Sequence, residues 1–201
     1  MADSLELLKA ELERFGQTND SVQTERGLRM LNITRDTGEL LSVLVRAARA
    51  RRILEIGTSN GYSTLWLAEA ARDIGGSVTT VETSVDKVRL ASATFGRSGL
   101  ASFIESIHDD AGRVLGSAAS DAFDLVFLDS ERSEYPGWWP DLRRVLRSGG
   151  LLVADNATSH RKQMAPFVAL VEADSDFETA LVPVGNGEFL AVKAGMPQAG
   201  A

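Results

Sequence analysis

An apolar run in this sequence ends in a glycine-containing turn whose spacing suits a nucleotide-like ligand. Residues 53–56 read Ile-Leu-Glu-Ile, and Gly57-Thr58-Ser59-Asn60-Gly61 follows before a helical pattern begins at Tyr62. The order strand, glycine turn, helix N-terminus builds ligand pockets in α/β proteins. The spacing matches neither the G-x-G-x-x-G pattern of dinucleotide folds nor a G-x-x-x-x-G-K-[ST] phosphate loop. Glu55 would also repel phosphate and attract an ammonium group, so the turn favours a nucleotide-like ligand without a pyrophosphate.

Acidic residues follow the next two predicted strands. Glu82 ends the second strand, where a doubly wound fold presents an acid to the ribose hydroxyls. Asp110-Ala111 follows the third strand and is placed to border a base ring. Each residue has a plainer interpretation as a strand-end or turn residue, but their order along the chain favours the ligand site.

Two later strands end in oxygen-bearing side chains. Phe123–Asp129 is an apolar run that ends in an acid, and Leu151–Ala154 is followed by Asp155-Asn156. The carboxyl ends of parallel strands share one sheet edge, and carboxylate and amide oxygens suit a hard divalent ion such as Mg²⁺. For any one of these residues helix capping is the alternative. Two strands that end alike favour a metal site.

The segment Leu54-Glu55-Ile56-Gly57-Thr58-Ser59-Asn60-Gly61-Tyr62-Ser63-Thr64 resembles the first motif of S-adenosylmethionine-dependent O-methyltransferases. The subgroup it resembles is the cation-dependent one that contains catechol and caffeoyl-CoA O-methyltransferases, and the likeness extends from about Met30 to Lys193. It implies that Asp129, Asp155 and Asn156 hold the metal, and that Asn32–Thr34 lies over the cofactor. The residues it implies for cofactor binding are Glu55, Gly57, Ser59, Gly61, Ser63, Glu82, Thr83, Asp110, Ala111 and Asp129.

This resemblance implies methyl transfer to an oxygen of a small hydroxylated acceptor, for example an aromatic compound with two vicinal hydroxyl groups. The family's lysine three residues after the first metal aspartate is replaced by Arg132, which stays charged and is not expected to act as a general base. Arg132 is a candidate for electrostatic stabilisation of the oxyanion, and His160 is a candidate base. Tyr135 is the best aromatic candidate to touch an acceptor ring.

Three alternatives stay open at this point. The first is a methyltransferase that works without metal on another acceptor, and the second is a cofactor-binding protein without turnover. A nicotinamide oxidoreductase is the third, disfavoured by the wide glycine turn and Glu55. The sequence does not identify the acceptor or the group that takes its proton.

The composition of the sequence excludes several classes of partner and of chemistry. The net charge of −7 argues against a nucleic-acid surface, and the absence of cysteine excludes disulfides and thiolate chemistry. No run approaches the ~18 apolar residues of a membrane span, and no signal-peptide pattern is present. We therefore expect a cytoplasmic enzyme or binding protein; a small-molecule acceptor and a homodimer are implied by the resemblance.

The elements that would position these residues alternate. Strands are predicted at 52–56, 77–82, 102–107, 123–129 and 151–154, and helices at 3–15, 37–50, 62–72, 85–97, 111–118, 136–147 and 161–173, with a loop at 17–24. Two final strands, 177–184 and 189–193, flank a glycine-rich turn typical of a β-hairpin. The prediction is one methyltransferase domain over 1–201, with an N-terminal helical cap (1–35) and a cofactor-binding core (36–194). Its fold is a doubly wound, Rossmann-like α/β sheet of seven strands, mostly parallel, with an antiparallel C-terminal hairpin.

Overall fold

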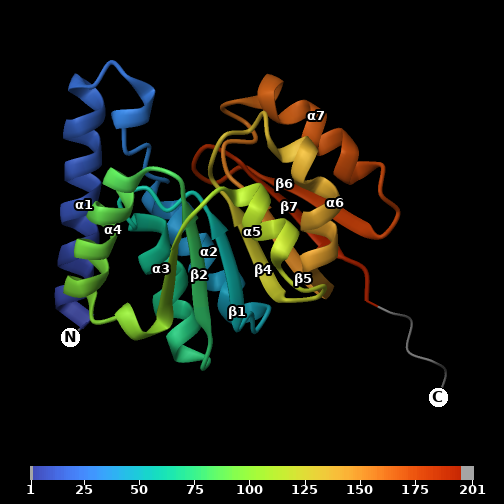
Figure 1. Ribbon diagram of the computed structural model, residues 1–201, viewed down its shortest axis with the longest axis horizontal. Helices are drawn as coiled ribbons and strands as arrows, with labels where there is room; N and C mark the ends of the chain where they lie inside the picture. The colour runs from blue at the N-terminus through green and yellow to red at the C-terminus, as the bar shows by residue number, and fades with distance from the viewer. Residues whose placement is uncertain (1, 196–201) are drawn as a thin grey trace.

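A computed structural model describes residues 2–195, which build one seven-stranded sheet covered by helices on both faces (Figure 1). The strand order is β3-β2-β1-β4-β5-β7-β6. Strands β1 to β5 pair in parallel, whereas β7 lies antiparallel between β5 and β6. The strands are β1 (Arg52–Ile56), β2 (Ser77–Glu82), β3 (Ile104–His108), β4 (Phe123–Leu128), β5 (Leu146–Ala154), β6 (Phe177–Val182) and β7 (Glu188–Lys193). The predicted fold class is confirmed.

Seven α-helices and two short 3₁₀ turns connect and cover the strands. They are α1 (Ala2–Val22), α2 (Arg35–Ala47), α3 (Tyr62–Asp73), α4 (Val85–Ser98), α5 (Ala111–Ser117), α6 (Tyr135–Val145) and α7 (Arg161–Glu172), with 3₁₀ turns at Arg26–Leu28 and Ala101–Phe103. Within the described range no helix combines the length and apolar character needed to cross a membrane.

The alternation of side chains along the central strands creates two cores. Ile53 packs with α2 and α3 on one face, and its neighbour Leu54 packs with α5, α6 and α7 on the other. Val126 and Phe127 divide between the two faces in the same way. Because both faces are covered, the strands read as continuous apolar runs, as expected of a parallel sheet.

Two elements differ from the sequence-based expectation by five residues or more. Helix α1 continues to Val22, through the polar stretch predicted as a loop, and Asp20 on it accepts the backbone N–H groups of Met30 (2.7 Å) and Leu31 (2.8 Å). Strand β5 begins at Leu146, before two glycines with a turn-like composition. In both places a tertiary contact, the Asp20 tether and the pairing of β5 with β4, outweighs the local composition.

Helix α1 is joined to the first core by a buried cation. The Lys9 side chain is fully buried, and its Nζ lies 2.9 Å from Glu6, 2.6 Å from Glu69 on α3, and 3.6 Å from the centre of the Trp66 ring. Removing an ammonium group from water has a large free-energy cost, and these close contacts with carboxylates and an aromatic ring offset it.

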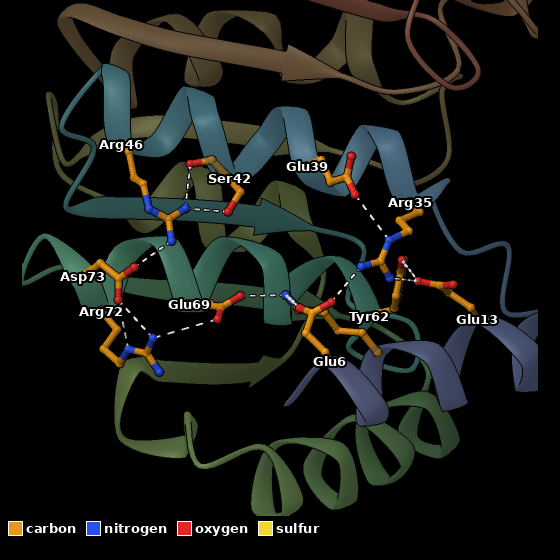
Figure 2. A network of polar contacts seen from close by, with 11 residues as sticks. Glu6, Glu13, Arg35, Glu39, Ser42, Arg46, Tyr62, Glu69, Arg72 and Asp73 are labelled. Atoms are coloured by element: carbon orange, nitrogen blue, oxygen red, sulfur yellow. Dashed lines mark hydrogen bonds and ion pairs between the residues drawn. The ribbon is translucent and has the colours of Figure 1, made fainter. Parts of the chain in front are cut away.

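A second set of polar contacts links α1 to the starts of α2 and α3 (Figure 2). Arg35 pairs with Glu6 (2.7 Å) and Glu13 (3.2 Å), and the Tyr62 hydroxyl donates to Glu13 (2.6 Å). Arg35 thereby ties the end of the α1–α2 connection, residues 23–34, back to α1, and residues of this connection border the site described next.

Candidate active site

A cavity of about 760 Å³ opens where β1, β2, β4 and β5 end. This volume is within the usual range for a small-molecule or cofactor site. Seven of the ten residues implied for cofactor binding line it: Gly57, Ser59, Glu82, Thr83, Asp110, Ala111 and Asp129. Asp155, Asn156, Arg132 and His160 line the same cavity. Glu55, Gly61 and Ser63 are not among its lining residues.

The glycine turn is held in close contact with the end of β4. Gly57 has φ +106°, and a Cβ atom on it would lie 2.0 Å from the carbonyl oxygen of Asp129. Only glycine tolerates both the backbone conformation and the approach. The turn therefore brings the first predicted half of the site directly against the second.

Ser59 joins the turn to two other segments. Its N–H donates to Glu82 (2.9 Å), and its hydroxyl donates to the carbonyl of Met30 (2.7 Å) in the α1–α2 connection. Ser59 itself has φ +48°, an unusual conformation for a residue with a side chain, which these two bonds hold in place.

Glu55 lies beneath the turn. Its carboxylate is fully buried and accepts hydrogen bonds from Ser63 (2.5 Å), Thr80 (2.6 Å) and Thr64. Burial raises its pKa to about 7 in spite of these three donors. In the structure Glu55 joins β1, β2 and α3, and its oxygens are engaged by protein hydroxyls.

The Glu82 carboxylate is oriented by backbone groups. It accepts the N–H groups of Ser59 (2.9 Å), Thr83 (3.0 Å) and Ser84 (2.9 Å). Asp110 caps α5 by accepting the N–H of Arg113 (3.0 Å) while it lines the cavity. Both acids therefore have fixed orientations and remaining acceptor capacity toward a ligand.

The acids that end β4 and β5 lie in mutual contact through Asn156. The Asn156 amide nitrogen lies 3.4 Å from Asp129 and 2.9 Å from Asp155. Burial raises the pKa of both carboxyl groups, and the repulsion of Asp155 adds to the increase at Asp129. Neither acid has a Lys, Arg or His nitrogen within 4.0 Å in the described part of the chain, so their negative charge is uncompensated at short range.

A fourth acid, Glu188 at the start of β7, was not recognised in the sequence. It is fully buried, and one of its oxygens accepts from the Thr37 hydroxyl (2.9 Å). Its other oxygen has no donor among residues 2–195, and burial together with the charge of Asp155 raises the pKa of Glu188 to about 9. The raised pKa favours the protonated form of Glu188, which has a proton to donate toward Asp155. The sequence signal was an acid in an otherwise apolar strand, which read as a turn residue.

Within residues 2–195 no three His, Cys, Asp or Glu side chains form a group that could hold a metal ion. The predicted set differs from such a group, because it consists of two acids and an amide. The amide presents its nitrogen to the acids here, and a half-turn of the side chain would present its oxygen.

Arg132 and His160 lie on the side of the cavity near these acids. Arg132 is 4% exposed, and its Nε donates to Gln163 on α7 (2.8 Å). His160 Nδ1 lies 2.9 Å from the Ser159 hydroxyl. Burial and the nearby Arg132 charge lower the pKa of His160, so it is neutral at pH 7 and able to accept a proton.

Tyr135 does not reach the cavity. The side chain is fully buried between Trp138 and Phe167, and its hydroxyl accepts the N–H of Ser130 (2.7 Å). The expectation that Tyr135 touches an acceptor ring is not met, because packing against α7 turns the ring inward. Four further lining residues, which sequence reasoning did not single out as site residues, come from the α1–α2 connection: Arg26, Arg29, Met30 and Leu31.

Comparisons with a protein-family profile and with individual relatives point to the same family. The sequence profile of a family described as O-methyltransferase matches residues 8–194. A relative from Mycobacterium tuberculosis (strain ATCC 25618 / H37Rv), named as an O-methyltransferase, is 32% identical over 174 residues, which cover 80% of this chain and 77% of the relative.

Solved structures agree. The O-methyltransferase from Bacillus cereus in complex with SAH superimposes with a TM-score of 0.77 and 25% identity, over 95% of this chain and 90% of that one. The O-methyltransferase TomG from Streptomyces achromogenes in complex with SAM gives a TM-score of 0.75 and 28% identity, over 92% and 89%. Together with the glycine motif and the architecture around it, these matches show that the chain belongs to the O-methyltransferase family.

Proposed function

We propose that this protein transfers a methyl group from S-adenosylmethionine to a hydroxyl oxygen of a small acceptor, assisted by a divalent cation such as Mg²⁺. The observation that carries the proposal is the shared cavity: the glycine turn after β1 and the acid pair after β4 and β5 border one space. Aromatic acceptors with two vicinal hydroxyls suit it, because two adjacent oxygens can chelate one cation.

The cofactor side is supported by the two relatives solved with SAM and SAH. Gly57 and Ser59 border the position proposed for the methionine part, Glu82 is placed to accept from ribose hydroxyls, and Ala111 borders the base. S-adenosylmethionine, when bound, supplies the electrophilic methyl group. The backbone bonds to Glu82 and Ser59 fix these contacts before the ligand arrives, which lowers the entropic cost of binding.

Asp129, Asp155 and Asn156 fit a divalent cation by three criteria. First, all three side chains offer hard oxygen donors. Second, the Asn156 amide contacts both Asp129 and Asp155, so the three groups lie together. Third, the two buried acids have no basic side chain within 4.0 Å among the described residues. A divalent cation, when bound, lowers the pKa of an acceptor hydroxyl and so favours the nucleophilic anion. Glu188, when protonated, has a proton to donate to Asp155, which would be the type of outer-shell support that metal ligands commonly have.

His160 is the candidate to accept the proton of the acceptor. It is neutral at pH 7, lines the cavity and belongs to the loop that follows Asn156. Arg132 keeps its charge and is suited to stabilise the developing oxyanion.

The test is a panel of catechols with S-adenosylmethionine, scored by release of S-adenosylhomocysteine, with and without EDTA. We expect EDTA to abolish turnover, Mg²⁺ to restore it, and Asp155→Ala to lower kcat/KM by about 100-fold or more. Asp86→Ala removes an exposed acid outside the cavity and should leave turnover unchanged. Turnover that survives both EDTA and Asp155→Ala would favour metal-independent transfer, and cofactor binding without turnover would favour a binding protein.

We further infer a homodimer from the family resemblance and a cytoplasmic location from the composition of the sequence. Light scattering of the purified protein at micromolar concentration tests the first, since a monomeric mass would contradict it. Fractionation of the native cells tests the second.

A further inference from the structure

Two arginines on the acceptor side of the cavity lack an acidic partner. Arg29 and Arg132 both line the cavity, and neither has a carboxylate within 4.0 Å in the part of the chain that the structure describes. Most arginines of this protein do pair with an acid. The exceptions inside a ligand cavity therefore call for an explanation.

Arg132 is the more deeply buried of the two. It is 4% exposed, and its one side-chain hydrogen bond runs from Nε to the neutral Gln163. The Nη groups make no hydrogen bond with described residues. A buried charge that lacks a counter-charge is costly, and a guanidinium leaves its planar fork available for a carboxylate or phosphate.

The nearest acids do not satisfy this charge. Asp129 and Asp155 lie within electrostatic reach of Arg132 but beyond 4.0 Å, and in the proposed function both are committed to the cation. With the cation in place, Arg132 would have no counter-charge from the protein.

Arg29 lies in the α1–α2 connection, a different segment of the cavity lining from the loop that carries Arg132. Its Nε is buried without a partner, and its side chain makes no hydrogen bond with described residues. Asp20 is the nearby acid and lines the same cavity; it interacts with Arg29 electrostatically but makes no ion pair with it within 4.0 Å among the described residues, and its oxygens accept the N–H groups of Met30 (2.7 Å) and Leu31 (2.8 Å). Arg29 therefore also lines the cavity without an ion-pair partner.

An ion pair joins the two segments that carry these arginines. Arg26, three residues before Arg29, pairs with Glu131, the neighbour of Arg132, at 3.9 Å. Both side chains of that pair are about half exposed, so the link is weak, but it brings the α1–α2 connection to the loop after β4.

Aromatic stacking is not the recognition mode that this side offers. Among the described lining residues the aromatic side chains are Trp138 and His160. The Trp138 Nε1 atom lies 3.2 Å from the position of a Cβ on Gly112, beside the start of α5 and the presumed base. The acceptor end of the cavity is therefore characterised by charged side chains and not by a pair of stacking aromatic rings.

From this geometry we propose that the acceptor carries an acidic group, a carboxylate or a phosphate, which Arg29 and Arg132 bind while its hydroxyl is methylated. The inference rests on the proposed function and narrows its substrate class to anionic hydroxylated compounds. The arginine fork suits both acidic groups, and the test below separates them.

The experiment uses three probes that share a catechol ring: 3,4-dihydroxybenzoate, its neutral analogue 3,4-dihydroxybenzamide, and 3,4-dihydroxyphenylphosphonate. The full chain is assayed with S-adenosylmethionine and Mg²⁺, and kcat/KM is measured for each probe. We expect one of the acids to exceed the amide by at least about tenfold, the factor that corresponds to 1.4 kcal/mol. Which acid is preferred decides between carboxylate and phosphate.

Two variants and a control locate the effect. Arg29→Gln should reduce the acid-to-amide ratio toward one, and Arg132→Lys should reduce it less because the charge is kept. Arg161→Gln removes an equal charge from an exposed residue next to His160 but outside the lining, and should leave the ratio unchanged. A wild-type ratio near one, or a ratio that Arg29→Gln leaves intact, overturns the inference.

Calorimetry in the presence of S-adenosylhomocysteine and Mg²⁺ separates this inference from the function on which it rests. If no probe is methylated but the acid still binds better than the amide, and Arg29→Gln removes the difference, the inference stands and the O-methylation proposal fails. If acid and amide are methylated equally well, the proposed function stands and the inference fails.

Discussion

The two halves of the cavity differ in how far the protein has satisfied its own charges. On the cofactor side, Glu55 is bonded by three hydroxyls and Glu82 by three backbone N–H groups. On the acceptor side, Asp129 and Asp155 face each other, while Arg29 and Arg132 have no acid within 4.0 Å among the described residues. The first half is complete without ligand, whereas the second requires charges from outside.

The two halves of the cavity therefore differ in how much they depend on a ligand. In the cofactor half, the turn after β1 is bonded to β2 and to the α1–α2 connection, and these protein groups satisfy one another. The acceptor half collects side chains from several distant segments, and its unsatisfied groups define what it can bind.

Gly57→Ala should give the largest effect, because Gly57 is where the two halves touch. The new Cβ would lie 2.0 Å from the Asp129 carbonyl at a φ of +106°, so the turn and the end of β4 must separate. We expect a loss of about 4 kcal/mol in the free energy of unfolding, from overpacking and backbone strain. Urea denaturation measures it.

Gly75→Ala is the matched control for this prediction. Gly75 also has a positive φ (+71°), but nothing lies within 4 Å of its added Cβ. It should cost only about 1 kcal/mol of backbone strain. Equal losses in the two variants would show that the contact between the halves is unimportant.

The pH dependence of stability should reveal the buried Glu55. Because its pKa is raised from 4.5 to about 7 by burial, the folded state holds the proton more tightly than the unfolded state. Its contribution to stability is present below pH 4.5 and is lost as the pH rises to about 7, which amounts to about 3 kcal/mol.

In the Glu55→Gln variant this side chain cannot ionise. The part of the pH dependence of stability that Glu55 contributes should therefore disappear. The raised pKa values of Asp129, Asp155 and Glu188 act in the same direction, so a shallower slope remains. Thermal melts of both proteins from pH 5 to 8 measure the difference. Parallel curves would mean that Glu55 does not titrate in this range.

On the acceptor side, Mg²⁺ should stabilise the protein more at pH 8 than at pH 6. Protons and the cation compete for Asp129 and Asp155, whose pKa values are raised by burial. At a concentration 100 times the dissociation constant we expect about 2.7 kcal/mol of stabilisation. Differential scanning fluorimetry tests this, with Asp155→Asn as the comparison; an Mg²⁺ effect that persists in the variant would place the ion elsewhere.

Glu82→Gln should weaken the binding of S-adenosylmethionine by about tenfold, because a charged acceptor for the ribose hydroxyls is replaced by a neutral group. The backbone N–H groups that orient Glu82 lose part of their acceptors as well, so the unfolding free energy is measured alongside the calorimetric affinity. An unchanged affinity would remove Glu82 from the cofactor site.

Tyr135→Phe should have the smallest effect. It removes the acceptor of the Ser130 N–H and should cost about 1 kcal/mol of stability while KM for the acceptor stays the same. A change in KM without a loss of stability would restore Tyr135 to the acceptor site.

Local sequence patterns were sufficient to predict the central strands, the glycine turn and the ends of the strands that border the cavity. Strands β1 and β2 have the predicted limits, and Asp129, Asp155 and Asn156 lie together at the expected sheet edge. These features follow from local patterns, namely apolar runs of fixed length, glycine spacing, and the rule that parallel strands end at one edge.

Which charged groups lack a partner depends instead on the packing of distant segments. Glu188 reaches Asp155 because β7 pairs antiparallel with β5 in the register that sets Phe189 opposite Ala154. Arg29 reaches the cavity because α1 extends to Val22 and Asp20 tethers the connection that follows. Proximity of this kind depends on strand register and helix docking over long sequence separations, and no local pattern encodes it.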